Sequence, residues 1–218
     1  MAKQLILMSG MPASGKDTVT EKLVSSHPQF IAFKKHRGIH VQDIPKSTYY
    51  NISYDEFESR IRSNEFLQYH LRYGRYYGVS KRELLNCFEQ KLIPIIHVGR
   101  LSNFFALKEA IMELEKEEGF TVILHHILLW ESKETLTARI MRRSSDKEEI
   151  KKRINAMNQE FEDNIAIMNQ GMKPFTIVIK NTNSEETSRI IFDLICNAII
   201  AEKVDGYIEF QTYLENLQ

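Results

Sequence analysis

Apolar runs of strand length alternate with longer amphipathic stretches along most of the chain. Four short runs predict buried strands, at residues 4–9, 92–98, 120–129 and 174–180. Patterns of helical period predict helices at residues 16–25, 103–117 and 184–203. Short apolar strands that alternate with helices are typical of a parallel sheet covered on both faces. The pattern therefore predicts an α/β fold.

Three capping boxes mark further helix starts. Each pairs a serine with a glutamate three residues later: Ser53 with Glu56, Ser80 with Glu83, and Ser145 with Glu148. In such a box the serine hydroxyl accepts a hydrogen bond from the backbone N–H of the glutamate. We therefore expect three helices that end near Ser63, Gln90 and Asn169.

A tyrosine-rich stretch at residues 47–79 interrupts the alternation of strands and helices. Residues 29–54, which overlap it, mix basic residues with glycine, proline and tyrosine, and predict an irregular or antiparallel β segment. We interpret residues 33–79 or so as a separate lobe of a single domain.

Composition excludes some classes of function. Lysine plus arginine equals aspartate plus glutamate at 29 each, so the basic excess of a typical nucleic-acid binder is missing. Cys87 and Cys196 form no metal-binding pattern. The first apolar run is too short for a signal peptide or a membrane span, so we expect a cytoplasmic protein without nucleic-acid or membrane partners.

The chemistry is concentrated in residues 10–18, GMPASGKDT, where a glycine is followed by four residues and then Gly-Lys. This spacing, between a predicted strand and a predicted helix, is that of a phosphate-binding loop. Its backbone N–H groups and the helix N-terminus attract phosphate, and Lys16 would reach the β and γ phosphates of ATP. We predict ATP contacts by Gly10, Ala13, Ser14, Gly15, Lys16, Asp17 and Thr18.

Asp17 stands where such loops usually place a Ser or Thr that ligates Mg²⁺. Either Mg²⁺ is held mainly by phosphates and water, which suits this ion, or Asp17 organises its hydration. The alternative for the whole motif is a glycine-rich turn before an ordinary helix, and the combination of strand, spacing, lysine and helix argues against it.

From Tyr49 onward the sequence resembles the guanylate kinase superfamily. The stretches that carry the likeness are YYNISYDEFESRIRSNEFLQYHLRYGRYYGVS, ETLTARIMRRSSDKEEIKKRINA and IVIKNTNSEETSRIIFDLI. The resemblance implies a three-layer P-loop fold of the nucleoside monophosphate kinase type over residues 1–203, with an acceptor-binding lobe near 33–79 and a lid near 140–153. It also implies phosphoryl transfer from ATP to a small molecule that already carries a phosphate.

Within that superfamily, three signatures resemble the ribose 1,5-bisphosphate phosphokinases. They are Gly-Lys-Asp at residues 15–17, Tyr-Tyr-Gly-Val at 76–79 and His-Val-Gly-Arg at 97–100.

The resemblance implies an acceptor-phosphate site at Arg37, Tyr49 and Tyr77, with His40 in place of a second arginine. The alternative is that the basic residues at 34–40 form a solvated charged loop.

Guanine-specific members use carboxylates to recognise the base, and this chain departs from them. Gln68 and Gly99 occupy the two carboxylate positions, and His97 replaces a strand aspartate that organises Mg²⁺. Buried donors without partners cost roughly 1–3 kcal/mol each, which makes GMP a poorer fit than a sugar phosphate or another nucleotide. We still expect Gln68 and His97 at the acceptor site.

The lid is expected to contribute Arg143 and Arg153 to catalysis, because they bracket its loop as the lid arginines of the family do. A charged helix face is the alternative for each. Asn181, just after the fourth strand, matches the asparagine near the ATP base, or else serves as a turn residue or helix cap.

We therefore expect an ATP- and Mg²⁺-dependent kinase. A binding module that has lost catalysis and an ATPase switch are the alternatives. Lys16 argues against the binding module and His97 argues for it. The tail at residues 204–218 is apolar enough to pack on the core or on a second subunit of a homodimer, and both arrangements remain open.

Overall fold

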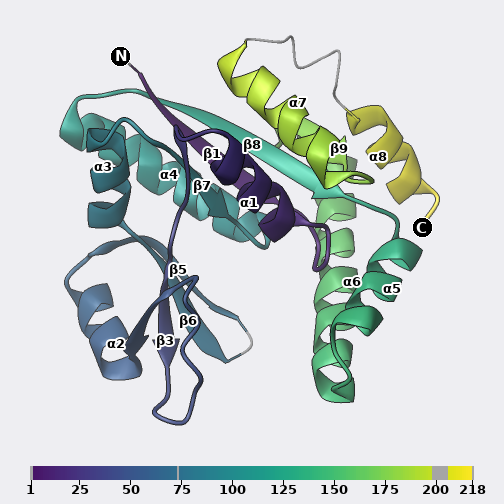
Figure 1. Cartoon of the computed structure of the whole chain (residues 1–218), viewed down its shortest axis with the longest axis horizontal. Coiled ribbons are helices and arrows are strands. Elements are labelled where there is room, and N and C mark those ends of the chain that lie inside the picture. The colour runs from purple at the N-terminus through teal and green to yellow at the C-terminus, as the bar shows by residue number, and fades with distance from the viewer. Residues whose placement is uncertain (1, 73, 198–205, 218) are drawn as a thin grey trace. The chain divides into compact units, whose positions relative to one another are not determined.

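The computed structural model describes residues 2–72, 74–197 and 206–217. Its strands are β1 (Lys3–Ser9), β2 (Phe30–Ala32), β3 (His36–Ile39), β4 (Tyr50–Ser53), β5 (Phe66–Arg72), β6 (Arg75–Ser80), β7 (Ile93–His97), β8 (Val122–Trp130) and β9 (Ile177–Lys180). Its helices are α1 (Lys16–Ser26), α2 (Tyr54–Arg62), α3 (Lys81–Glu89), α4 (Leu101–Glu118), α5 (Lys133–Arg143), α6 (Lys147–Asn169), α7 (Ser184–Cys196) and α8 (Tyr207–Glu215) (Figure 1).

The core is a five-stranded parallel sheet in the order β2-β7-β1-β8-β9. The central strand β1 runs through Leu5, Ile6, Leu7 and Met8, all with 0% exposure. A strand buried on both faces needs apolar residues at consecutive positions, which is why these strands show no alternation. The predicted α/β class is confirmed.

A second sheet has the order β4-β3-β6-β5. Strand β6 pairs antiparallel with β3 and β5, whereas β3 pairs parallel with β4. The expected irregular or antiparallel segment at 29–54 is therefore only partly correct, because β2 joins the core sheet in parallel with β7. Helix α2 covers one face of the second sheet, where Phe57 stacks on Phe66 at 4.5 Å and on Tyr76 at 5.1 Å.

Two of the three predicted caps are confirmed. The Ser53 hydroxyl accepts from Glu56 N at 3.1 Å, and the Ser80 hydroxyl accepts from Glu83 N at 3.4 Å. The Ser145 cap is wrong, because Asp146 caps α6 with a carboxylate oxygen that accepts from the backbone N–H groups of Glu148 and Glu149. A carboxylate at this position also interacts favourably with the positive end of the helix dipole. Helix α5 has no counterpart among the helices predicted from periodicity.

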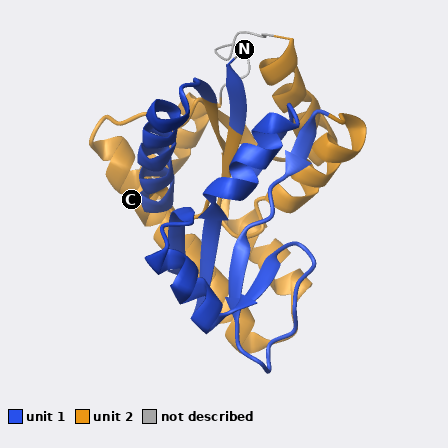
Figure 2. Ribbon diagram, turned by 90° about the vertical axis from the view of Figure 1, so that its left-hand side faces the viewer, with its two compact units in different colours: residues 1–5, 29–96, 102–123 blue, residues 6–28, 97–101, 124–218 orange. Residues whose placement is uncertain are grey.

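The chain forms two compact units, coloured separately in Figure 2. Unit 1 comprises residues 1–5, 29–96 and 102–123, and unit 2 comprises residues 6–28, 97–101 and 124–218. The expected lobe at 33–79 falls in unit 1, and the expected lid at 140–153 falls in unit 2.

The described part of the C-terminal tail packs on its own chain. Phe210 is fully buried, with its ring centroid 5.2 Å from that of Trp130, and Lys133 N donates to the Tyr213 hydroxyl at 2.6 Å. A homodimer stays a prediction. Helix α7 ends at Cys196, so the expected extension over 198–203 lies outside the described residues, as do positions 204, 205 and 218 of the tail. Within the described ranges, no helix is long and apolar enough to cross a membrane.

Candidate active site

The phosphate loop connects β1 to α1 through a tight backbone turn. Gly10, Ala13 and Gly15 have φ angles of 148°, 67° and 97°. A Cβ at Gly10 would lie 2.3 Å from Leu129 O, and a Cβ at Gly15 would lie 2.2 Å from Asn181 Nδ2. Both glycines are therefore required by close approach as well as by backbone angle.

Lys16 lies at the start of α1 and points back into the loop. Its ammonium donates to the carbonyls of Gly10 and Met11 and to the Ser14 hydroxyl, the last two at 3.1 and 3.4 Å. Helix α1 begins without a side-chain cap, so its first N–H groups receive no side-chain acceptor at the N-cap. A positive charge beside an uncapped helix N-terminus is suited to bind phosphate.

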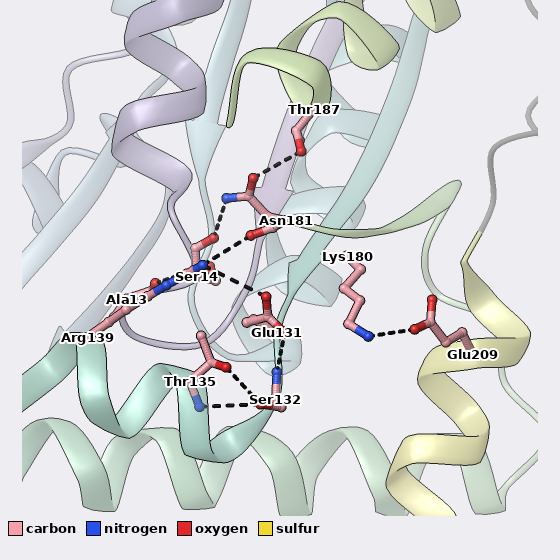
Figure 3. A network of polar contacts seen from close by, with 10 residues as sticks. All are labelled: Ala13, Ser14, Glu131, Ser132, Thr135, Arg139, Lys180, Asn181, Thr187 and Glu209. Atoms are coloured by element: carbon pink, nitrogen blue, oxygen red, sulfur yellow. Dashed lines mark hydrogen bonds and ion pairs between the residues drawn. The ribbon is translucent and has the colours of Figure 1, made fainter. Parts of the chain in front are cut away.

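Two residues of unit 2 outside the loop, Asn181 and Arg139, donate hydrogen bonds to its backbone carbonyls, as Figure 3 shows. Asn181, which is 4% exposed, donates from Nδ2 to Ser14 O at 2.7 Å and accepts from the Thr187 hydroxyl at 2.9 Å. Arg139 of α5 donates to Ala13 O at 3.4 Å and to Asn181 O at 3.3 Å. The Arg139 guanidinium also lies 3.8 Å from the carboxylate of Glu131.

These contacts refine the sequence predictions. The Asn181 side chain fixes the loop, and its expected contact with the ATP base stays a prediction. The sequence prediction preferred Arg143 and Arg153 to Arg139, although Arg139 lies one helical turn before Arg143 on the same face of α5. That spacing was the available signal for a second arginine at the loop.

Asp17, Thr20 and His97 form a connected group beside the loop. His97 Nε2 lies 2.7 Å from the Thr20 hydroxyl, and His97 Nδ1 lies 3.3 Å from Asp17 Oδ1. The pKa of Asp17 is lowered to about 2, mainly by the hydrogen bond to His97 and also by the charges of His97, Lys16 and Arg143, against a burial effect that raises it. Asp17 is thus an exposed carboxylate that stays ionised.

The two arginines that the resemblance assigns to a lid differ in their surroundings. The charge of Arg143 contributes to lowering the pKa of Asp17, so Arg143 interacts electrostatically with the phosphate loop. Arg153 is 2.7 Å from Glu149 one turn earlier in α6. His97 belongs to unit 2 with the loop, and its predicted contact with the acceptor stays a prediction.

The second sheet in unit 1 carries the other predicted acceptor residues on the face away from α2. Tyr77 of β6 is the register partner of Arg37 on one side and of His70 on the other. Opposed residues in an antiparallel pair share a face, so these three side chains form one row. The Tyr49 ring lies edge-on to Tyr77 at 5.4 Å. The structure thus brings Arg37, Tyr49 and Tyr77 together.

Arg37 is buried but weakly bonded. It is 5% exposed, and its terminal nitrogen is 3.4 Å from both Ile44 O and Asn51 Oδ1. Its Nε has no hydrogen-bond partner among the described residues. A buried guanidinium with long contacts and an unused donor is suited to a ligand oxygen.

The side-chain amide of Gln68 makes hydrogen bonds through its nitrogen but not through its oxygen. Nε2 donates to Tyr69 O at 2.9 Å, and contacts His70 Nδ1 at 3.2 Å and Asn103 Oδ1 at 3.3 Å. Its Oε1 has no partner within the described chain. His40 instead stacks on Tyr54 at 4.2 Å, and no described contact links it to the Arg37 row.

Comparisons with known proteins show the family of the chain. The family model for guanylate kinase matches residues 2–198. A guanylate kinase of Clostridium tetani is 28% identical over 215 residues, covering 96% of this chain and 97% of that protein. One from Prochlorococcus marinus is 30% identical over 196 residues, covering 88% and 97%.

A crystal structure of guanylate kinase from Anaplasma phagocytophilum has a similar fold, with a TM-score of 0.57 at 19% identity over 89% of this chain and 85% of that one. The resemblance to ribose 1,5-bisphosphate phosphokinases stays a prediction. Because the family model spans most of the chain, this protein belongs to the guanylate kinase family, whose members are ATP-dependent phosphotransferases with a phosphate group as acceptor.

Proposed function

We propose that this chain transfers the γ-phosphoryl group of ATP to the phosphate of a small phosphorylated molecule. The observation that carries the proposal is the Lys16 ammonium inside a left-handed loop at the uncapped N-terminus of α1. The residues at 10–18 bind the ATP phosphates, with Ala13 and Ser14 held by Arg139 and Asn181.

The reaction needs no nucleophilic side chain. An oxygen of the acceptor phosphate forms a bond to the γ-phosphorus, the bond from that phosphorus to the bridging β-γ oxygen breaks, and ADP leaves. Arg37, Tyr49 and Tyr77 hold the acceptor phosphate. Lys16 and the lid arginines Arg143 and Arg153 stabilise charge on the transferring group, and exclusion of water prevents ATP hydrolysis.

Mg²⁺ fits the residues beside the loop. Across the described residues, no three His, Cys, Asp or Glu side chains gather closely enough to hold a metal ion. Mg²⁺ commonly takes one or two carboxylates and completes its coordination with substrate phosphates and water. Asp17, exposed and ionised, is the residue we assign to the ion or its hydration shell. When bound, Mg²⁺ neutralises charge on the phosphates.

Two acceptors are candidates. GMP is supported by the guanylate kinase relatives, and a ribose bisphosphate is supported by Gln68 and Gly99, which replace carboxylates. ADP release with ATP, Mg²⁺ and either GMP, dGMP, AMP, CMP, UMP or ribose 1,5-bisphosphate tests the proposal. Lys16→Ala is the blank, and Lys22→Ala, at a half-buried lysine of the same helix that pairs with Glu185, is the matched control.

Stimulation by one acceptor that requires Lys16 but not Lys22 supports the kinase and names its substrate. ADP release that no acceptor increases indicates an ATPase switch instead. Binding of ATP without turnover by any acceptor favours a binding module, the second candidate, for which His97 in place of the strand aspartate is the supporting observation.

A further inference from the structure

The Asp17 carboxylate is the exposed end of a short chain of polar contacts that leads into the core of unit 2. His97 Nδ1 lies 3.3 Å from Asp17 Oδ1, and His97 Nε2 lies 2.7 Å from the Thr20 hydroxyl. The Asp17 side chain is 82% exposed and that of His97 is 30% exposed, whereas Thr20 is 3% exposed. Thr20 lies one turn after Asp17 in α1, so the two side chains share a face of the helix and His97 bridges them.

These contacts determine which nitrogen of His97 carries the proton that faces Asp17. A lone pair on Nδ1 would face the ionised carboxylate and repel it, so we place the proton on Nδ1, which donates it to Asp17. Nε2 then accepts a hydrogen bond from the Thr20 hydroxyl, which also lies 3.7 Å from the weakly accepting sulfur of Met8. Thr20 therefore favours the tautomer of His97 that can donate to Asp17.

An exposed carboxylate in a phosphate loop has two opposite effects on ATP. Its charge repels the phosphates of metal-free ATP, but it attracts a nucleotide whose phosphates carry Mg²⁺. The benefit is obtained only if the carboxylate is held in position, because an exposed side chain otherwise loses rotamer freedom when it meets the ion.

An unrestrained Asp17 would also compete with the phosphates. Helix α1 begins without a side-chain cap, and a carboxylate in its first turn is able to turn back to the N-terminal N–H groups that bind phosphate. The contact with His97 opposes this movement. Because the two carboxylate oxygens belong to one planar group, a hydrogen bond at Oδ1 also restricts the position of Oδ2.

We propose that Thr20 and His97 are positioning residues that hold the Asp17 carboxylate for the cation of the bound nucleotide, and so make the chain selective for metal-bound over metal-free ATP. This inference rests on the proposed function, because residues 10–18 are taken to bind the ATP phosphates and Asp17 to meet the ion or its hydration shell. Thr20 is buried and acts only through His97.

Calorimetric binding of a non-hydrolysable ATP analogue to the full chain tests the inference, once with excess Mg²⁺ and once with EDTA. The ratio of the two affinities is the metal selectivity, and it depends on neither an acceptor nor turnover. His97→Phe keeps a ring but removes both nitrogens, and Thr20→Val removes the hydroxyl. Thr137→Val is the matched control, because the Thr137 hydroxyl donates to Lys133 O within α5. Thermal unfolding of each variant verifies that it is folded.

Outer-shell partners of a metal ligand typically contribute about 10- to 100-fold to metal affinity. We therefore expect His97→Phe to lower the metal selectivity by about tenfold, with the affinity in EDTA changed by less than about threefold. Thr20→Val should act in the same direction to a smaller extent, and Thr137→Val should match the wild type. Asp17→Asn should also lower the selectivity, and should bind the metal-free analogue more tightly because the repulsion is removed.

A second substitution separates positioning from a merely structural role. His97→Asn retains an amide N–H near the position of Nδ1, and should keep most of the selectivity that His97→Phe loses. Three results would overturn the inference: a wild type without metal selectivity, unchanged selectivity in His97→Phe or Asp17→Asn, or an equal loss of affinity with and without Mg²⁺. If the selectivity depends on His97 and Asp17 but no acceptor is phosphorylated, the proposed kinase activity fails and the positioning role stands.

Discussion

The Asn181 side-chain amide donates a 2.7 Å hydrogen bond to the backbone carbonyl of Ser14. This contact joins the turn after β9 to the middle of the phosphate loop, across 167 positions of sequence. The carboxamide oxygen of the same residue accepts from Thr187 in α7. The loop conformation therefore depends on a residue that need not touch the nucleotide.

Asn181→Ala should weaken ATP binding between about twofold and tenfold, because the Ser14 carbonyl and the Thr187 hydroxyl each lose a buried partner. Equilibrium titration with a fluorescent ATP analogue measures the change. Asn183→Ala is the matched control, since it removes the cap of α7 and costs about 1 kcal/mol of stability without contact to the loop. Unchanged affinity in Asn181→Ala would contradict the positioning role.

Because both Ala13 and Gly15 have left-handed backbone angles, substitutions at the two positions should have opposite effects on stability. Ala13→Gly should raise the free energy of unfolding by up to about 1 kcal/mol, because an L-residue at a φ of 67° is strained and glycine is not.

Gly15→Ala should lower the free energy of unfolding by roughly 1–3 kcal/mol through backbone strain. The close contact of the new Cβ with Asn181 Nδ2 should lower it further. Urea unfolding of both variants measures these changes. A destabilised Ala13→Gly variant would argue against the left-handed conformation in solution.

Lys35 should lower the stability of the protein. Its pKa falls from 10.5 to about 8, so below pH 8 the folded state carries a charge that burial disfavours. The unfolded state binds the proton more tightly, and the free energy of unfolding should rise as the pH increases from about 8 to about 10.5.

Lys35→Met should raise the free energy of unfolding at neutral pH by up to about 3 kcal/mol and remove the contribution of this group to the alkaline rise. Urea unfolding at several pH values tests this, and Lys34→Met should change little. A less stable Lys35→Met variant would mean that the lysine has a compensating partner.

Two histidines of unit 1 should make the protein sensitive to acid. Burial lowers the pKa of His36 to about 4 and that of His70 to about 3, from 6.5. The unfolded state therefore binds protons first, and stability that is fully present above pH 6.5 is lost as the pH falls toward those values. The urea concentration at the midpoint of unfolding should decrease as the pH is lowered from about 7 to about 5. The decrease should be smaller in the His70→Gln variant. A midpoint that stays constant would rule out this explanation.

The C-terminal helix should contribute to the stability of unit 2. Phe210→Ala removes a fully buried ring that packs on Trp130, and should lower the free energy of unfolding by about 3–5 kcal/mol. Ile208→Ala, at a side chain that is 81% exposed, should be nearly neutral. The fluorescence of Trp130, the single tryptophan of the sequence, reports the unfolding directly. Equal effects of the two substitutions would place Phe210 of α8 away from Trp130 of β8.

Short sequence patterns were sufficient to predict the phosphate loop and two of the helix caps. The phosphate loop was predicted because two glycines, a lysine and the flanking strand and helix are contiguous in the chain. The caps at Ser53 and Ser80 follow from a four-residue pattern. The Ser145 cap was wrong because Asp146, a stronger cap, competes one position later and the pattern does not rank the two.

The sequence by itself thus determined the α/β class and the phosphate-loop motif, since each is set by contiguous residues, whereas the acceptor-site residues were implied by the family resemblance. Only the tertiary structure decided that Asn181 and Arg139 hold the loop, that His97 bonds Asp17 and Thr20, and that Lys35 is buried. These relationships join residues far apart in the chain through strand register and burial. Both depend on how the whole chain packs, and no local pattern encodes them.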